Sequence, residues 1–180
     1  MKVVSIVGMS GSGKSEVAAI FRDCGYTPVR FGDITDEAVT GRGLELNEVN
    51  EREVREELRR EHGMEAYAVL SVPRIDAALK SSDVVVDGLY SWEEYMYLRQ
   101  RYGKDFVVIA VYSSPETRYA RLADREVRPL TADEATGRDR AEIENLDKGG
   151  PIAMADFTII NESSFDDMKR QAERIIADLK

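Results

Sequence analysis

Cysteine, histidine and tryptophan each occur once in this chain of 180 residues. A single cysteine, Cys24, excludes an internal disulfide, which is typical of a reducing compartment, so we expect a cytoplasmic protein. Cys24 falls late in an expected amphipathic helix, and we interpret it as a buried structural thiol rather than a catalytic one. The single histidine, His62, precedes Gly63 at the expected end of a charged helix, where a structural role is sufficient because a helix C-terminus favours a cation.

Long apolar runs and an excess of positive charge are also missing. The most apolar run, 106–112, is far too short to span a membrane, so we expect no membrane association. The formal net charge is −9, whereas proteins that bind nucleic-acid backbones over a broad surface are usually basic. Nucleic acid is therefore not an expected partner, although a local basic cleft stays possible in an acidic protein. The length and the 43% hydrophobic content suit one compact α/β domain.

Five short apolar segments alternate with helical patterns. The expected strands cover 3–7, 29–31, 83–87, 106–112 and 157–160. Ser91 to Glu94 has the pattern of a capping box, and Ser114 with Pro115 is a second strong helix start. This order predicts a doubly wound, five-stranded parallel sheet with helices on both faces, of the P-loop nucleoside monophosphate kinase type. Ligands of such sheets bind beyond the carboxyl ends of the strands.

The remaining segments predict helices of different character. A largely charged helix with a thin apolar stripe is expected over 47–62, and a more apolar one over 64–79, where Pro73 kinks or divides it. A last amphipathic helix is expected over 164–179. The polar, arginine-rich stretch 125–150 is interpreted as a mobile lid inserted in a single domain.

One motif carries most of the functional information. Residues 8–15 read GMSGSGKS and match G-x-x-x-x-G-K-[ST], with an expected strand before it and a helix after it. Gly11 and Gly13 allow positive φ, so that successive backbone N–H groups point at phosphate oxygens. Lys14 then places a compact charge on the β- and γ-phosphates, and the Ser15 hydroxyl is an expected Mg²⁺ ligand. The alternative is a glycine-rich turn with a stray lysine. The expected contacts to ATP are Gly8, Ser10, Gly11, Ser12, Gly13, Lys14, Ser15 and Glu16.

Two aspartates follow expected strand ends. Asp87 ends a Val-Val-Val strand, where a carboxylate holds a magnesium-bound water or orients an attacking hydroxyl; the alternative is a turn cap. Asp33 follows the second strand and faces the phosphate acceptor in a small kinase, where it accepts a proton or holds a hydroxyl. The alternative for Asp33 is an N-cap of the next helix.

Arginines cluster in the second half of the chain. Arg118, Arg121 and Arg125 are spaced three and four apart, so they share one helix face, and Arg138 and Arg140 follow in the lid. Phosphoryl transfer needs positive charge around the migrating group, and the guanidinium fork suits it. For any single arginine a surface ion pair is the competing interpretation. We select Arg121 and Arg138 as the catalytic candidates.

Several segments together resemble a known family. They are GMSGSGKSEVA at 8–18, FGD at 31–33, VVVDGLYSWEEY at 84–95, YSSPETRYARL at 112–122, GRDRAE at 137–142 and MADFTIINESS at 154–164. The chain resembles the small P-loop kinase-like proteins, common in archaea, that are related to dephospho-CoA kinase and adenylate kinase. The resemblance implies that Asn161 lies near the base, that Arg121 and Arg138 belong to the lid side, and that residues 36–79 cover the acceptor. Relatives often carry arginine where this chain has Tyr90. Tyr90 and Trp92 are candidates for stacking on a flat acceptor.

The sequence therefore predicts an ATP- and Mg²⁺-dependent kinase that transfers the γ-phosphoryl group to a small nucleotide-like acceptor. Lys14, Asp33, Asp87, Arg121 and Arg138 are the expected catalytic residues. The alternative is an ATP-binding switch, or slow ATPase, that acts through a protein partner.

Overall fold

A single parallel sheet forms the centre of the protein in the computed structural model, which describes residues 1–126 and 129–180. Its strands lie in the order β2-β3-β1-β4-β5, and every neighbouring pair is parallel. The predicted five-stranded α/β fold is confirmed. The strands are β1 (Val3–Val7), β2 (Thr27–Arg30), β3 (Val84–Asp87), β4 (Phe106–Tyr112) and β5 (Phe157–Ile160).

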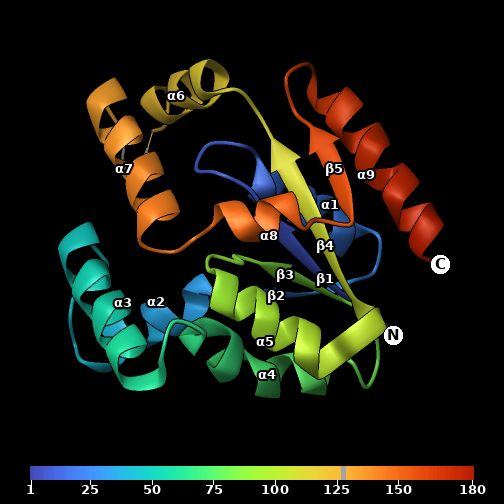
Figure 1. Ribbon diagram of the computed structural model, residues 1–180, viewed down its shortest axis with the longest axis horizontal. Coiled ribbons are helices and arrows are strands. Elements are labelled where there is room, and N and C mark those ends of the chain that lie inside the picture. The colour runs from blue at the N-terminus through green and yellow to red at the C-terminus, as the bar shows by residue number, and fades with distance from the viewer. Residues whose placement is uncertain (127–128) are drawn as a thin grey trace.

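Helices cover both faces of the sheet (Figure 1). They are α1 (Lys14–Asp23), α2 (Gly32–Gly41), α3 (Glu48–His62), α4 (Ala66–Ala78), α5 (Trp92–Tyr102), α6 (Pro115–Ala123), α7 (Ala132–Glu144), α8 (Gly149–Ala153) and α9 (Phe165–Leu179), with a 3₁₀ turn at Gly103–Asp105. In the described part of the chain, none of them has the length and apolar character that a membrane span requires.

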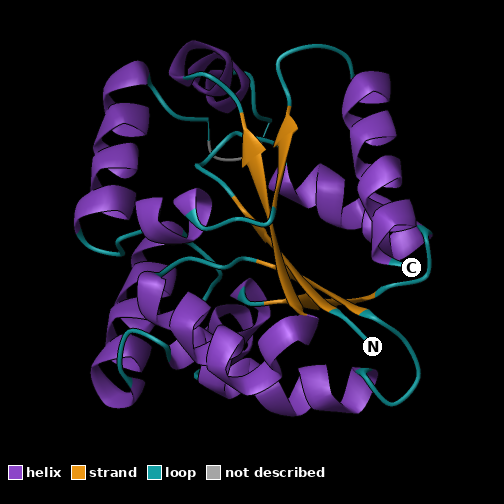
Figure 2. Cartoon of the chain, turned by 45° about the vertical axis from the view of Figure 1, so that its right-hand side comes forward, coloured by secondary structure: helices purple, strands orange, loops and turns teal. Residues whose placement is uncertain are grey.

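The two faces of the sheet are packed by alternate residues of the same strands. In β3, Val84 and Val86 pack with α2 to α5, whereas Val85 packs on the other face with α1 and α9. All three valines are fully buried, as expected for a central parallel strand whose two faces are both covered. Figure 2 shows the sheet between these two helical layers. The rigid sheet fixes where its carboxyl ends, and the loops that leave them, lie.

Local helix signals agree with the structure at most positions. Ser91 and Glu94 form the predicted capping box, and Ser114 caps α6 through the backbone N–H of Thr117. Helix α4 runs undivided through Pro73, so the predicted division is wrong.

The prediction of a buried thiol is also wrong, because Cys24 is exposed. Val17, Ile20 and Phe21 form the buried stripe of α1, and helical spacing extends that stripe to position 24. The helix ends at Asp23, however, and Cys24 is already the C-cap residue, followed by Gly25 with a φ of 99°. The chain turns away from the core before the thiol reaches it.

Strand register determines which side chains meet at the functional edge. Asp87, the last residue of β3, is paired with Ile6 of β1 on one side and with Arg30 of β2 on the other. The P-loop follows β1, and α2 with Asp33 follows β2. Asp87 therefore lies between the phosphate-binding loop and the segment that the sequence assigns to the acceptor.

Candidate nucleotide-binding site

The loop between β1 and α1 has the backbone conformation that an anion cradle needs. Gly11 and Gly13 have φ values of 82° and 97°, and a Cβ on Gly13 would collide with the side-chain amide of Asn161. Gly13 is also the N-cap of α1 and has no side chain to satisfy the first N–H groups of that helix. These N–H groups and the helix dipole favour a negatively charged group in front of them.

Lys14 is the first cation of the site. It is half-buried, and its Nζ donates to the carbonyl of Met9 at 3.0 Å, within the same loop. Burial and the nearby Lys148 ammonium lower the pKa of Lys14 to about 7. The Glu142 and Asp87 carboxylates oppose this shift, and Arg138 adds to it. Lys14 thus carries a charge that is poorly neutralised, which an incoming phosphate stabilises.

The lowered pKa of Lys14 predicts that ATP binding is coupled to proton uptake. At about pH 8 much of Lys14 is neutral, and a bound phosphate raises its pKa, so ATP binding is expected to take up as much as about one proton. Affinity for ATP should accordingly fall as the pH rises through this range. Calorimetric titrations in two buffers of different ionisation enthalpy measure the uptake. Lys14→Arg, which stays protonated, is the control, and equal uptake in both proteins would contradict the assignment.

Ser15 and Asp87 supply paired oxygens beside Lys14. The Ser15 hydroxyl, at the exposed start of α1, donates to Asp87 Oδ2 at 3.2 Å. A hydroxyl and a carboxylate at this separation are the oxygen donors that Mg²⁺ prefers in a P-loop, with water and phosphate completing the shell. The two residues that the sequence selects for magnesium are therefore in contact.

Asp33 lies in the first turn of α2 rather than at its N-cap, which is Phe31, so the capping interpretation is wrong. A capping Asp has extended backbone just before the helix, whereas α2 begins at Gly32 directly after β2. Instead, Arg30 donates to Asp33 at 2.8 Å and to Asp36 at 2.7 Å. These hydrogen bonds raise the pKa of Arg30 above its usual value, and they hold the exposed Asp33 carboxylate in place. Nothing in the sequence pattern had marked Arg30.

Arg118 connects the P-loop to helix α7. The residue is only 4% exposed. Its guanidinium forms two hydrogen bonds to Asp139, at 2.8 and 2.6 Å, and donates to the carbonyl of Ser10 at 3.1 Å. It also donates to the carbonyl of Ser113 at the end of β4. Arg118 is thus a positioning residue that holds α6, α7 and the P-loop together.

Glu142 and Lys148 form a second link between α7 and the P-loop. Ser10 Oγ donates to Glu142 Oε1 at 2.9 Å, and Lys148 Nζ donates to Glu142 Oε2 at 2.9 Å. Burial alone would raise the pKa of Glu142, but Lys148 and Lys14 outweigh it and hold that pKa at about 2. The sequence reasoning missed both residues, and the only available signal was their place in the lid stretch.

The structure separates the two arginines selected from the sequence. Arg138 on α7 approaches Glu142 at 3.5 Å and lies close enough to Lys14 to lower its pKa. Arg121 instead donates to Ser113 Oγ at 3.0 Å and to the backbone carbonyl of Asn161 at 3.0 Å, so it braces the ends of β4 and β5. Burial and Arg138 together lower the pKa of Arg125. Residues 127–128 of the predicted lid lie outside the described residues.

Asn161 supports the P-loop through a hydrogen bond to the loop backbone. Its side-chain amide donates to the carbonyl of Ser12 at 2.9 Å, and the residue is 8% exposed. Glu16 is exposed in the first turn of α1. The structure thus brings the loop, Lys14 and Asn161 into one unit at the start of α1.

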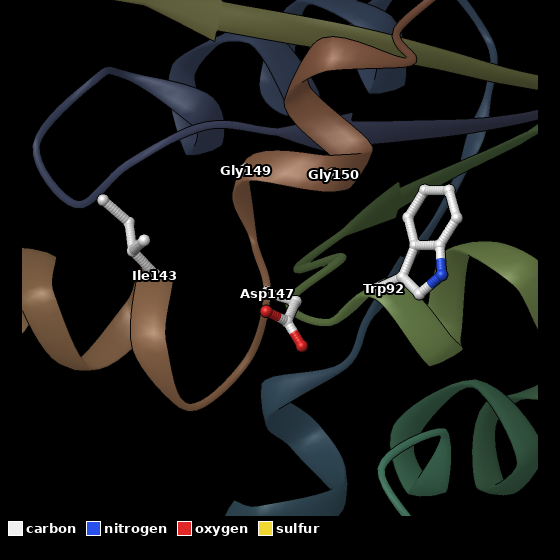
Figure 3. Close-up of a pocket in the computed structure, with 5 residues that line it drawn as sticks. All are labelled: Trp92, Ile143, Asp147, Gly149 and Gly150. Atoms are coloured by element: carbon white, nitrogen blue, oxygen red, sulfur yellow. The ribbon is translucent and has the colours of Figure 1, made fainter.

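A pocket of about 310 Å³ lies beside the segment that carries Lys148 (Figure 3). Its lining comes from Trp92 of α5, Ile143 of α7, and Asp147, Gly149 and Gly150 around the start of α8. Trp92 stacks on Tyr95, with ring centroids 5.1 Å apart. The Tyr90 ring lies outside this lining, 5.4 Å from Lys148 Nζ.

Comparison with known proteins identifies the family. A family model described as an AAA domain matches residues 4–145. UPF0200 protein TK1334 of Thermococcus kodakarensis is 35% identical over 98% of this chain and 97% of its own length. The chain belongs to the UPF0200 family. UPF0200 protein MJ1399 of Methanocaldococcus jannaschii is 36% identical over 99% of this chain and 91% of its own length. The predicted relationship to an archaeal P-loop kinase-like family is confirmed.

Kinases are among the solved structures similar to this UPF0200 protein. A gluconokinase from Sinorhizobium meliloti superposes with a TM-score of 0.64 at 18% identity, covering 99% of this chain and 93% of the kinase. A shikimate kinase from Bacteroides thetaiotaomicron gives 0.63 at 14% identity, with 99% and 98% covered. Dephospho-CoA kinase from Campylobacter jejuni gives 0.56 at 16% identity, with 99% and 97% covered. These likenesses establish that the chain has the fold of P-loop kinases.

Proposed function

We propose that this protein is a cytoplasmic, ATP-dependent phosphotransferase that moves the γ-phosphoryl group to a small nucleotide-like acceptor. The supporting observation is the register of β1, β3 and β2, which sets Asp87 between the P-loop and the end of β2. The residues that we assign to the donor and to the acceptor therefore share one edge of the sheet. Lys14 and Arg138 provide positive charge there, and Asp33 provides an oriented carboxylate.

The proposed roles follow from these positions. Lys14 neutralises charge on the β- and γ-phosphates, and Ser15 with Asp87 would hold Mg²⁺, which would offset phosphate charge when bound. Asp33, oriented by Arg30, holds the acceptor hydroxyl or takes its proton as the acceptor oxygen bonds to the γ-phosphorus and the bond to the β–γ bridging oxygen breaks. Arg138 closes over the transferring group and helps to exclude water. We place Arg121 and Asn161 at the base end of the nucleotide.

The segments around the site have proposed roles as well. Residues 36–79, which include α3 and α4, would cover the acceptor, and residues 125–150 would act as a lid over the phosphates. The hydrogen bond from Ser10 of the P-loop to Glu142 of α7 supports this second role, because it holds α7 against the phosphate-binding loop.

An acceptor panel tests the proposal. Purified protein with ATP and Mg²⁺ is incubated with nucleoside monophosphates, dephospho-CoA and related nucleotides, and phosphorylated product is measured. We expect one acceptor class to stimulate ATP turnover. Asp33→Asn should lower that stimulated rate about a hundredfold while ATP binding persists, because the acceptor loses its orienting carboxylate.

The matched control is Asp23→Asn, which changes an exposed aspartate paired with Arg22 at the far end of α1. Its stimulated rate should stay close to that of the unaltered protein. ATP binding without stimulation by any acceptor would sink the kinase proposal and favour a nucleotide switch that acts through a protein partner.

A further inference from the structure

Lys148 is a buried cation that the kinase mechanism above does not use. It is 1% exposed, although lysine is almost never fully buried unless it is paired. Its Nζ donates to the Glu142 carboxylate at 2.9 Å and lies over the face of the Tyr90 ring, 5.4 Å from the ring centroid. A cation with such partners, next to Lys14, adds to the positive potential of the phosphate-binding loop.

The backbone around Lys148 fixes the direction of its side chain. Asp147 has a φ of 48°, in the left-handed region that a non-glycine residue enters at some cost. The N–H of Trp92 donates to Leu146 O at 3.2 Å, and the N–H of Lys148 donates to Glu142 O at 3.3 Å. The connection between α7 and α8 is thus tied to α5 and to α7 on either side of this turn. The turn directs the buried Lys148 side chain to Glu142, which in turn contacts Ser10 of the P-loop.

The Glu142 carboxylate contacts a P-loop hydroxyl and cationic side chains, which are the kinds of group that bind phosphate. It accepts from the hydroxyl of Ser10, a P-loop residue, at 2.9 Å and from Lys148 at 2.9 Å. Arg138 Nε lies 3.5 Å from the same carboxylate, and Lys14 interacts with it electrostatically. Glu142 is therefore an internal anion among three cations and a P-loop hydroxyl.

We propose that Lys148 is a phosphate-binding residue, and that a nucleoside triphosphate entering the site takes the Lys148 ammonium over from the Glu142 carboxylate. This inference rests on the proposed function, because it requires a triphosphate in the P-loop. Ammonium groups donate to phosphate as well as to carboxylate, and the triphosphate carries more charge than Glu142. Lys148 then holds the terminal phosphate, while Glu142 leaves Ser10 and loosens the hold of α7 on the loop.

Two substitutions with opposite expected effects test the exchange. Lys148→Met removes the charge but keeps an apolar stem over Tyr90, and it should weaken binding of inorganic tripolyphosphate and of ATP at least about tenfold. Glu142→Gln keeps the shape and a possible bond to Ser10 but removes the competing charge, so it should tighten both about tenfold. Calorimetric titration of the full chain gives the dissociation constants.

An exposed pair of the same two residue types serves as the control. Lys169 and Glu173 face each other on α9 at 3.8 Å, both half-exposed. Lys169→Met and Glu173→Gln should each leave tripolyphosphate and ATP affinity within about twofold, because an exposed surface pair contributes little.

The direction of the changes separates the possible outcomes. If the pair only braces the fold, both site variants should weaken binding together, and that result would overturn the inference. Glu142→Gln alone is decisive where Lys148→Met does not fold, since unchanged or weaker binding contradicts the exchange. Unaltered affinity in both variants, with normal ATP binding by the parent, overturns this inference but not the kinase. A parent that binds neither ATP nor tripolyphosphate overturns both.

Discussion

Lys14→Ala is expected to lower the rate of acceptor-dependent phosphoryl transfer at least about a thousandfold, because Lys14 is the P-loop cation that neutralises charge on the β- and γ-phosphates as the phosphoryl group moves. The fold should survive, since the hydrogen bond that Lys14 Nζ makes in the protein is to the carbonyl of Met9, in the same loop. Product formation from ATP measures the first effect, and circular dichroism with urea unfolding measures the second.

Lys104→Ala is the control for the loss of a lysine, because Lys104 is exposed in the 3₁₀ turn before β4. It should turn over ATP like the parent protein. A Lys14→Ala protein that is folded and still transfers phosphate within about tenfold of the parent rate would refute the assignment of the P-loop as the reacting site.

Arg118→Met is expected to cost about 3 kcal/mol of unfolding free energy, because removing one partner of a buried ion pair leaves an uncompensated charge. The Asp139 carboxylate would keep the hydroxyl of Tyr119 as a partner, and the carbonyls of Ser10 and Ser113 would lose a donor. Urea unfolding followed by circular dichroism gives the change.

Arg140 provides the matched comparison on the outer side of α7. It pairs with Glu144 at 2.7 Å, but its side chain is 74% exposed. Arg140→Met should cost no more than about 0.5 kcal/mol. If the two variants lost similar amounts of stability, the link between α7 and the P-loop would not be the structural brace inferred from its geometry.

The sequence predicted the features that depend on residues close together along the chain. The strands are continuous apolar runs, the capping box of Ser91 and Glu94 spans four residues, and the P-loop is a contiguous motif. Asp87 could be assigned to the site because it ends a strand, and strand ends of a parallel sheet meet at one edge. These inferences need periodicity and spacing, but no knowledge of the partners.

The parts that the sequence could not supply depend on distant pairings. Ser10 and Glu142 are 132 residues apart, and Arg118 reaches Ser10 across 108 residues. Neither separation leaves a trace in the local pattern, so Lys148 remained unmarked and Arg118 was grouped with its neighbours on spacing alone. Arg121 shares a helix face with Arg118 in sequence, yet its partners are the Ser113 hydroxyl and the Asn161 carbonyl, at the ends of β4 and β5. Helical spacing predicts which side chains point the same way, but it does not predict which distant residues they contact.

Asn161 contributes a hydrogen bond to Ser12 from 149 residues further along the chain, and α9 packs directly on α1. During synthesis on the ribosome, the nucleotide-binding loop emerges with β1, well before the residue that braces it and the helix that covers α1. A nascent chain therefore carries its most recognisable motif long before that motif has its native support. The newly made protein gains a fully formed loop only after the edge strand β5 and α9 have been made.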